Sequence, residues 1–197
     1  MLGSPLHAIA AFEREHGIPE GFVNRVVVET GAGGAWARLE RGELDLGAFV
    51  PAFEADCFAA GQRIAVGTMM ARMAETARPR SPMLETIRRI RANGLLAAAL
   101  TNNWSNGDEA NAGDALREHF DAFFESSVLG LQKPDPRIYR HACRSLGVEA
   151  SEAVFLDDIG RNLKAARELG MATIKVADVS SALAELEALL GFALPRG

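Results

Sequence analysis

The sequence predicts an α/β protein, with a Rossmann-like parallel sheet covered by helices and a small helical module before it. In the second half, short apolar runs alternate with helical patterns, which is typical of parallel strands joined by right-handed crossovers. These runs lack polar alternation, as expected for strands covered on both faces. No strand pattern occurs before about residue 95. We therefore expect a helical cap over residues 1–80 and an α/β core over residues 81–197.

The first part of the chain shows apolar residues at helical spacing, interrupted by glycine and proline. Leu6, Ile9 and Phe12 share one helical face, and Gly17 and Pro19 end the pattern. Asp45 is expected to cap a longer helix. The expected helices cover residues 6–16, 19–29, 35–41 and 46–60.

The second part contains the predicted sheet. The expected strands cover residues 95–100, 126–129, 153–156 and 172–176. The expected helices cover residues 81–92, 135–146, 162–169 and 180–190, with a polar loop over residues 105–113 and a helix from there toward residue 120. Gly94, Gly147 and Gly170 follow three of these helices, where a left-handed terminal residue is favoured.

Composition excludes several classes of protein. The formal charge of −5 comes without a basic block, which argues against a nucleic-acid partner. No run approaches the roughly 18 apolar residues of a membrane span, and no signal-peptide pattern opens the chain. The two cysteines, Cys57 and Cys143, lack metal-ligand spacing, so we expect a reduced, cytoplasmic protein.

Polar residues follow three of the predicted strands. Thr101 and Asn102 follow the first, Lys133 follows the second, and Asp157 and Asp158 follow the third. Because ligands bind beyond the carboxyl ends of parallel strands, we expect these side chains to lie together. A hydroxyl, an amide, an ammonium and two carboxylates are the groups that phosphoryl transfer with magnesium requires.

Each residue also has a structural interpretation. Thr101 could end a strand as a turn residue, and Lys133 could be a solvated surface lysine. Asp157 and Asp158 could stabilise a helix N-terminus, although two adjacent carboxylates repel each other unless a cation offsets the charge. The three clusters in this order are more specific than any one of them.

Residues 101–102, 133–139 and 155–158 resemble motifs II, III and IV of the haloacid dehalogenase superfamily, and residues 100–104 with 157–167 resemble one branch of it more closely. The resemblance is strongest to the branch that contains the N-terminal phosphatase domain of soluble epoxide hydrolase. Residues 36–44 resemble the helical cap that this branch inserts after its first core strand. The resemblance covers nearly the whole chain.

The resemblance implies roles for the strand-end residues. Thr101, Asn102 and Lys133 would bind the phosphoryl group, and Lys133 would also bridge the nucleophile and the phosphate. Thr101, Lys133 and Asp157 would form the catalytic set.

The same resemblance implies Mg²⁺ as the cofactor. Asp158 would be the direct metal ligand and Asp157 would act through a metal-bound water. Asn162 would belong to the outer shell of the site.

The nucleophilic aspartate that the family carries at the end of its first core strand has no counterpart before the cap, so we expect that strand to be missing. The family places it between the strands that here end at Thr101 and Asp157, and its loss would expose unpaired backbone groups. Three explanations remain open. The start codon is misassigned, the third strand pairs directly with the first, or the chain is a degraded relative that does not catalyse.

The leading functional hypothesis is a Mg²⁺-dependent phosphatase that acts on a small phosphorylated metabolite through an aspartyl-phosphate. A 2-haloacid dehalogenase is the alternative reaction, although the paired acids Asp157 and Asp158 favour phosphate chemistry. A non-catalytic phosphate-binding or regulatory relative is the alternative from another class. The sequence leaves the oligomeric state open, with a homodimer as one option.

Overall fold

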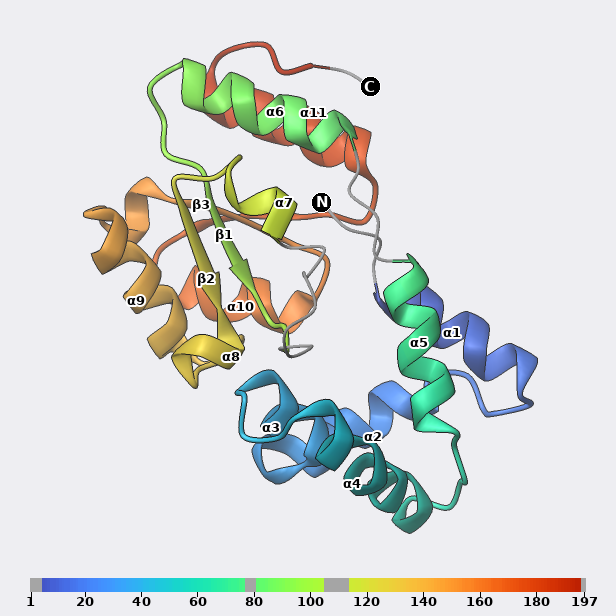
Figure 1. Ribbon diagram of the computed structural model, residues 1–197. Helices are drawn as coiled ribbons and strands as arrows, with labels where there is room; N and C mark the ends of the chain where they lie inside the picture. The colour runs from blue at the N-terminus through green and yellow to red at the C-terminus, as the bar shows by residue number, and fades with distance from the viewer. Residues whose placement is uncertain (1–4, 77–80, 105–113, 196–197) are drawn as a thin grey trace.

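The computed structural model describes residues 5–76, 81–104 and 114–195. It contains a body of helices from the N-terminal part of the chain and a second body with all the described strands (Figure 1). We call them the helical body, α1 to α5, and the α/β body, α6 to α11 with β1 to β4. The predicted loop over residues 105–113 lies outside the described residues.

The helical body confirms the predicted absence of strands within its described residues. Its helices are α1 (Pro5–Glu15), α2 (Phe22–Thr30), the short 3₁₀ helix η1 (Gly31–Gly33), α3 (Ala35–Glu40), α4 (Leu46–Ala59) and α5 (Val66–Thr76). Asp45 caps α4 as predicted, because its Oδ1 accepts a 2.7 Å hydrogen bond from the backbone N–H of Ala48.

An aromatic cluster forms the core of the helical body. Phe49 and Phe53 of α4 are stacked at 5.4 Å, and Trp36 of α3 meets both rings edge-on. Glu13 of α1 is buried, and its carboxylate accepts hydrogen bonds from the N–H groups of Gly21 and Val23 at 2.8 and 2.9 Å. These bonds join α1 to the start of α2, because the first N–H groups of a helix have no partner within it.

The α/β body alternates strands and helices, as predicted. Its elements are α6 (Ser81–Ala92), β1 (Ala98–Thr101), α7 (Asp114–Arg117), β2 (Ala122–Glu125), α8 (Ser126–Leu129), α9 (Pro136–Leu146), η2 (Ala150–Glu152), β3 (Val154–Asp157), α10 (Gly160–Glu168), β4 (Ala172–Lys175) and α11 (Val179–Leu190).

The described strands pair in two separate parallel sheets. β1 pairs with β2, with Thr101 opposite Glu125, and β3 pairs with β4, with Asp157 opposite Lys175. The parallel direction is as predicted, but the expected single sheet is divided between β1 and β3. The explanation in which the third strand closes directly onto the first is therefore not the arrangement that the structure has.

Two predicted strands need correction. The strand expected over residues 126–129 is helix α8, and the strand itself is the preceding β2. Ser126 is fully buried, and its hydroxyl bonds the N–H and the carbonyl of Asn103 at 3.0 and 3.2 Å, which anchors α8 to the loop after β1. The strand expected from residue 95 begins three residues later at Ala98, and Leu95 and Leu96 are exposed.

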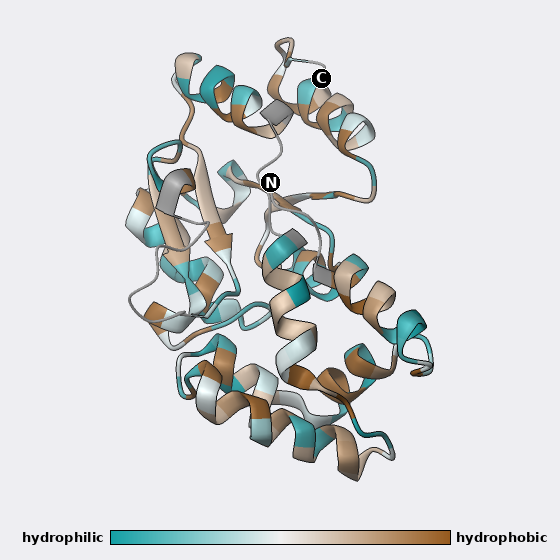
Figure 2. Ribbon diagram, turned by 45° about the vertical axis from the view of Figure 1, so that its right-hand side comes forward, coloured by the Kyte–Doolittle hydropathy of each residue, from teal (hydrophilic) through white to brown (hydrophobic). Residues whose placement is uncertain are grey.

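Helices cover both sides of β3. Phe155 packs against a cluster that includes Tyr139 of α9 and Ala166 of α10, whereas its neighbours Val154 and Leu156 pack against a cluster that includes residues of α11, which α6 also contacts. Alternate residues of a strand point to opposite faces, so β3 is covered on both. Figure 2 shows hydrophilic and hydrophobic residues alternating along the helices, as expected for helices with one face on the core and the other in water.

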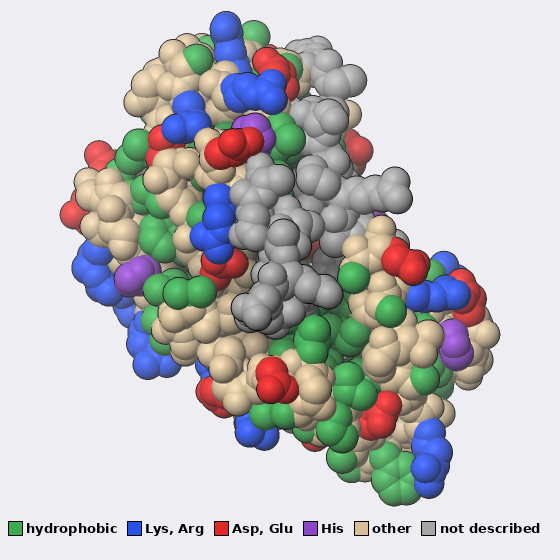
Figure 3. All heavy atoms as spheres, in the orientation of Figure 1, with side chains coloured by type: hydrophobic (Ala, Val, Ile, Leu, Met, Phe, Trp, Pro, Cys, Tyr) green, Lys and Arg blue, Asp and Glu red, His purple; other side chains and the backbone are tan. Residues whose placement is uncertain are grey.

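The surface carries mixed charge. In the view of Figure 3, Lys and Arg side chains are interspersed with Asp and Glu side chains, in keeping with the absence of a basic block in the sequence. Among the described helices, none has the length and apolar character needed to cross a membrane.

Candidate active site at the strand ends

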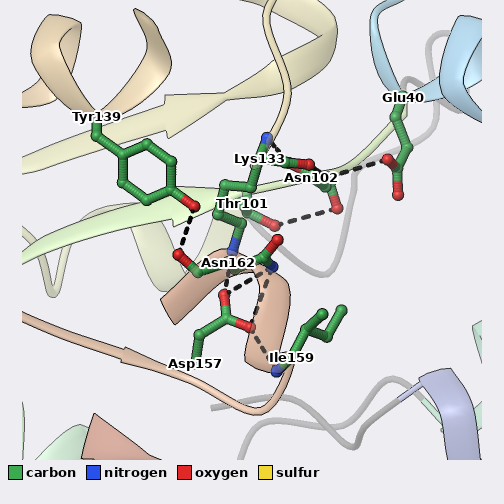
Figure 4. Close-up of polar contacts among 8 residues, drawn as sticks. All are labelled: Glu40, Thr101, Asn102, Lys133, Tyr139, Asp157, Ile159 and Asn162. Atoms are coloured by element: carbon green, nitrogen blue, oxygen red, sulfur yellow. Dashed lines mark hydrogen bonds and ion pairs between the residues drawn. The ribbon is translucent and has the colours of Figure 1, made fainter. Parts of the chain in front are cut away.

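The centre of the site is an ion pair between Lys133 and Asp157. The Lys133 Nζ atom lies 2.7 Å from Asp157 Oδ2, and the two side chains are 12% and 5% exposed (Figure 4). Asp157 is the last residue of β3, and Lys133 belongs to the segment between α8 and α9. The structure therefore brings together two of the predicted residues from different elements.

Asn102 fixes the backbone of Lys133. Its Oδ1 accepts a 2.8 Å hydrogen bond from the Lys133 N–H, and its Nδ2 donates a 3.0 Å bond to the Lys133 carbonyl. This two-bond pairing holds the Lys133 segment against the end of β1. The lysine ammonium is thus oriented from its backbone as well as by its carboxylate partner.

The start of α10 holds the other side of Asp157. Asp157 Oδ1 accepts hydrogen bonds from the Ile159 N–H at 2.8 Å and from Asn162 Nδ2 at 3.1 Å. Asn162 is buried, and its backbone carbonyl accepts a 3.0 Å bond from the Tyr139 hydroxyl. Burial raises the pKa of Tyr139, which keeps this hydroxyl a protonated donor.

Thr101 and Asp158 lie at the margin of this network. Thr101 ends β1, and its hydroxyl donates a long 3.4 Å bond to the carbonyl of Asn102. Asp158 directly follows Asp157 but is exposed. Asn102, Lys133, Asp157 and Asn162 therefore share one hydrogen-bonded network, which Thr101 adjoins through its bond to Asn102. Asp158 is the next residue after Asp157.

The helical body contributes a residue that the sequence analysis missed. Glu40 of α3 accepts hydrogen bonds from Trp36 Nε1 at 3.1 Å and from Asn102 Nδ2 at 3.0 Å. Burial raises the pKa of Glu40, against the lowering effects of these two bonds and of Arg161 and Lys133. The spacing of four residues on one helix could have predicted the bond between Trp36 and Glu40, but no sequence pattern predicts the contact of Glu40 with Asn102.

A second missed carboxylate lies at the end of β2. Glu125 is largely buried and bonded to the Asn103 amide and to Arg117. Its place beside the site follows from the register, because Glu125 pairs with Thr101 at the same sheet edge. Because this strand was expected over residues 126–129 and not over Ala122–Glu125, the position of Glu125 at a strand end was not recognised.

The described residues fit a magnesium ion with oxygen ligands. Mg²⁺ is commonly held by one or two protein carboxylates together with water and substrate phosphate, and Asp157 and Asp158 supply such a pair. Asn162 Oδ1 is buried without a hydrogen-bond partner, and the same amide bonds Asp157 through Nδ2, so this oxygen would be available to accept from a metal-bound water. No group of three or more His, Cys, Asp or Glu side chains with metal-ligand geometry occurs within the described part of the chain.

Comparisons with known proteins identify relatives along nearly the whole chain. Bifunctional epoxide hydrolase 2 of Sus scrofa is 35% identical over 198 residues, which is 94% of this chain and 36% of the relative. Acyl-CoA dehydrogenase family member 10 of Mus musculus is 37% identical over 202 residues, which is 100% of this chain and 19% of the relative. The chain thus spans about a third or less of the length of these curated relatives.

A solved structure shares the fold. A HAD family enzyme of Bacteroides thetaiotaomicron, crystallised with magnesium and inorganic phosphate, is 18% identical with a TM-score of 0.59 and covers 91% of each chain. The model of the haloacid dehalogenase-like hydrolases matches residues 6–170. This match, together with the parallel strands and the residues at their ends, shows that the chain belongs to the haloacid dehalogenase-like hydrolase family.

Proposed function

We propose that this chain is the phosphate- and magnesium-binding part of a phosphatase acting on a small phosphorylated metabolite. The observation that carries the proposal is the Lys133 ammonium, held 2.7 Å from Asp157 while Asn102 fixes the Lys133 backbone. A cation that is oriented before the substrate arrives stabilises developing negative charge without reorganisation. Phosphoryl transfer depends mainly on such positioning and electrostatics.

Each donor at the site has a task in this proposal. The Thr101 hydroxyl and the Asn102 amide bind phosphoryl oxygens, and the Lys133 ammonium offsets their charge. Asp157 keeps the ammonium in place through the bond at 2.7 Å. The relative from Bacteroides thetaiotaomicron, which was crystallised with magnesium and phosphate, supports this choice of ligands.

Magnesium would be held by Asp158 directly and by Asp157 through water, with Asn162 Oδ1 accepting from the hydration shell. When bound, the ion neutralises charge on the phosphoryl oxygens. Asp157 Oδ2 already faces Lys133, which agrees with an indirect role for Asp157.

The attacking carboxylate comes, in this proposal, from a strand that pairs with β1 and β3. Within the described residues, each of these strands pairs on one side, β1 with β2 and β3 with β4. Asp157 is engaged by Lys133, Ile159 and Asn162, which makes it a poor nucleophile. A carboxylate at the end of an added central strand would attack phosphorus and form an aspartyl-phosphate as the P–O bond to the substrate breaks. The substrate oxygen would leave as an alcohol after taking a proton, and water would then hydrolyse the aspartyl-phosphate to inorganic phosphate.

The test compares the 197-residue chain with a version extended at its N-terminus by an added strand that ends in aspartate. Hydrolysis of p-nitrophenyl phosphate is measured with Mg²⁺ and with a chelator. We expect Mg²⁺-dependent turnover in the extended protein and none in the shorter chain. In the extended protein, Lys133→Met should lower kcat by about 10²–10³. Lys164→Met is the matched control, because this α10 lysine is 77% exposed.

Three results would contradict the proposal. One is turnover by the shorter chain, which would place a nucleophile among its own residues. Another is a kcat of the extended protein that is unchanged by the chelator, or that Lys133→Met changes by less than twofold. The third is release of halide from 2-chloropropionate without metal, which would establish the dehalogenase alternative.

A further inference from the structure

Glu40 joins the helical body to the candidate phosphate site. Of the labelled residues in Figure 4, Glu40 is the one that comes from the helical body. Its carboxylate lies between the Trp36 indole of the same helix and the Asn102 amide of the α/β body. The contact spans 62 positions of the sequence and places a carboxylate where the proposed function requires an anion.

The hydrogen atoms of the Asn102 amide are fully used. A side-chain NH₂ group has two donors, and here one goes to Glu40 Oε2 and the other to the Lys133 carbonyl, both at 3.0 Å. A phosphoryl oxygen can therefore bind this amide only by displacing one of the two acceptors. The Lys133 bond is supported by a second bond from the Lys133 N–H to Asn102 Oδ1, whereas the Glu40 bond stands alone. Glu40 is thus the partner that gives way.

Electrostatics act in the same direction. Burial raises the pKa of Glu40, whereas Arg161 and Lys133 oppose that rise, so these cations favour the Glu40 carboxylate in its charged form. A phosphate bound at Asn102 and Lys133 would share these cations with Glu40 and repel its carboxylate. Two anions that use the same donors and the same cations bind in competition.

The contact belongs to a wider interface on α3. Trp36 meets Trp104 edge-on at 6.2 Å, and Arg41 Nη1 donates to Gln132 Oε1 at 3.3 Å. Trp104 lies two residues after Asn102, and Gln132 directly precedes Lys133. Movement of Asn102 away from Glu40 would therefore affect the packing of α3 against both loops of the site.

We propose that Glu40 is a positioning residue that occupies the Asn102 amide while no phosphate is bound and yields it when phosphate binds. Phosphate binding then loosens the contact of α3 with the α/β body, and release of phosphate restores it. Because the two acceptors compete, whatever weakens the Glu40–Asn102 bond strengthens phosphate binding. The competition between Glu40 and phosphate for the Asn102 amide rests on the proposed function, whereas the bond by which Glu40 holds Asn102 does not.

Tryptophan fluorescence reports on this interface directly. The chain has two tryptophans, Trp36 and Trp104, and they meet there. Inorganic phosphate is titrated into the wild-type chain with Mg²⁺ present, and acrylamide quenching is followed. We expect quenching to increase on phosphate binding, because the Trp36 side of the interface opens. Without phosphate, Glu40→Met, which has no side-chain oxygen to accept from Asn102 Nδ2, should already show increased quenching.

Calorimetry of the same titration measures the competition. Glu40→Gln removes the charge, and Glu40→Asp keeps the charge but shortens its reach by one methylene, so both should bind phosphate about tenfold more tightly than wild type. Glu29→Gln on α2 is the matched control for charge, because Glu29 is exposed, and its affinity should stay within twofold. Circular dichroism verifies that all variants are folded.

The outcomes separate the two proposals. Phosphate binding with unchanged or weaker affinity in both Glu40 variants overturns the competition and leaves the proposed function standing. Tightening in Glu40→Gln alone attributes the effect to charge and overturns the role of the hydrogen bond. Absence of phosphate binding in every protein overturns the proposed function and the competition together. Unchanged quenching in phosphate-free Glu40→Met overturns the holding of Asn102 by Glu40.

Discussion

Replacing Lys133 by methionine tests the centre of the site through stability alone. The substitution keeps most of the side-chain volume but removes the cation 2.7 Å from Asp157 Oδ2. Asp157 is 5% exposed, so it would be left as a buried charge without its counterion. Breaking a buried ion pair from one side costs about 3–5 kcal/mol. Asp157 retains bonds from Ile159 and Asn162, so we expect about 3 kcal/mol.

Urea denaturation at neutral pH, followed by circular dichroism, measures this loss. Asp157→Asn removes the other charge, and the double variant completes the cycle. We expect the double variant to lose about 1.5–3 kcal/mol less than the two single losses added together, because the second substitution removes the charge that the first leaves without a partner. The matched Lys164→Met should change the free energy of unfolding by less than about 0.5 kcal/mol. A loss below about 1 kcal/mol in Lys133→Met, or simple additivity in the cycle, would refute the reasoning.

Three further predictions concern other parts of the chain. Asp121→Ala should cost about 1 kcal/mol in urea denaturation, because Asp121 accepts a 2.8 Å bond from the Ala97 N–H. That bond lowers the pKa of Asp121, so its contribution is present above the ordinary pKa and should disappear as pH falls through the lowered one. Cys57, whose pKa burial raises to about 12, should react with a thiol reagent at pH 8 only after denaturant is added, and fast labelling of the native chain would contradict this. Gly42→Ala should increase acrylamide quenching of the tryptophans, because a Cβ at φ +70° would lie 2.5 Å from the Ser127 carbonyl, and unchanged quenching would count against this close approach.

The sequence determined much of the local structure and the type of chemistry. Apolar spacing predicted most of the helices, but α5 was missed and α8 was expected as a strand. Asp45 capped α4 as expected, because a helix N-terminus needs an acceptor wherever it lies. Asn102 and Asp157 were recognised because ligands bind beyond the carboxyl ends of parallel strands. Lys133 was expected directly after a strand, whereas it follows helix α8. Lys133 and Asp157 meet as a pair, although their roles in catalysis remain predictions.

Other features were decided by the tertiary structure alone. Residues 126–129 form α8, because the buried Ser126 hydroxyl bonds the backbone of Asn103, 23 positions away. The division of the sheet between β1 and β3 depends on which strands are available to pair. The apolar pattern of a single strand does not identify the strand with which it pairs. The Glu40–Asn102 bond joins two segments whose distance only the packing of α3 sets. Local patterns report the preferences of a segment, whereas a hydrogen bond between distant segments exists only when the whole chain brings donor and acceptor within about 3 Å.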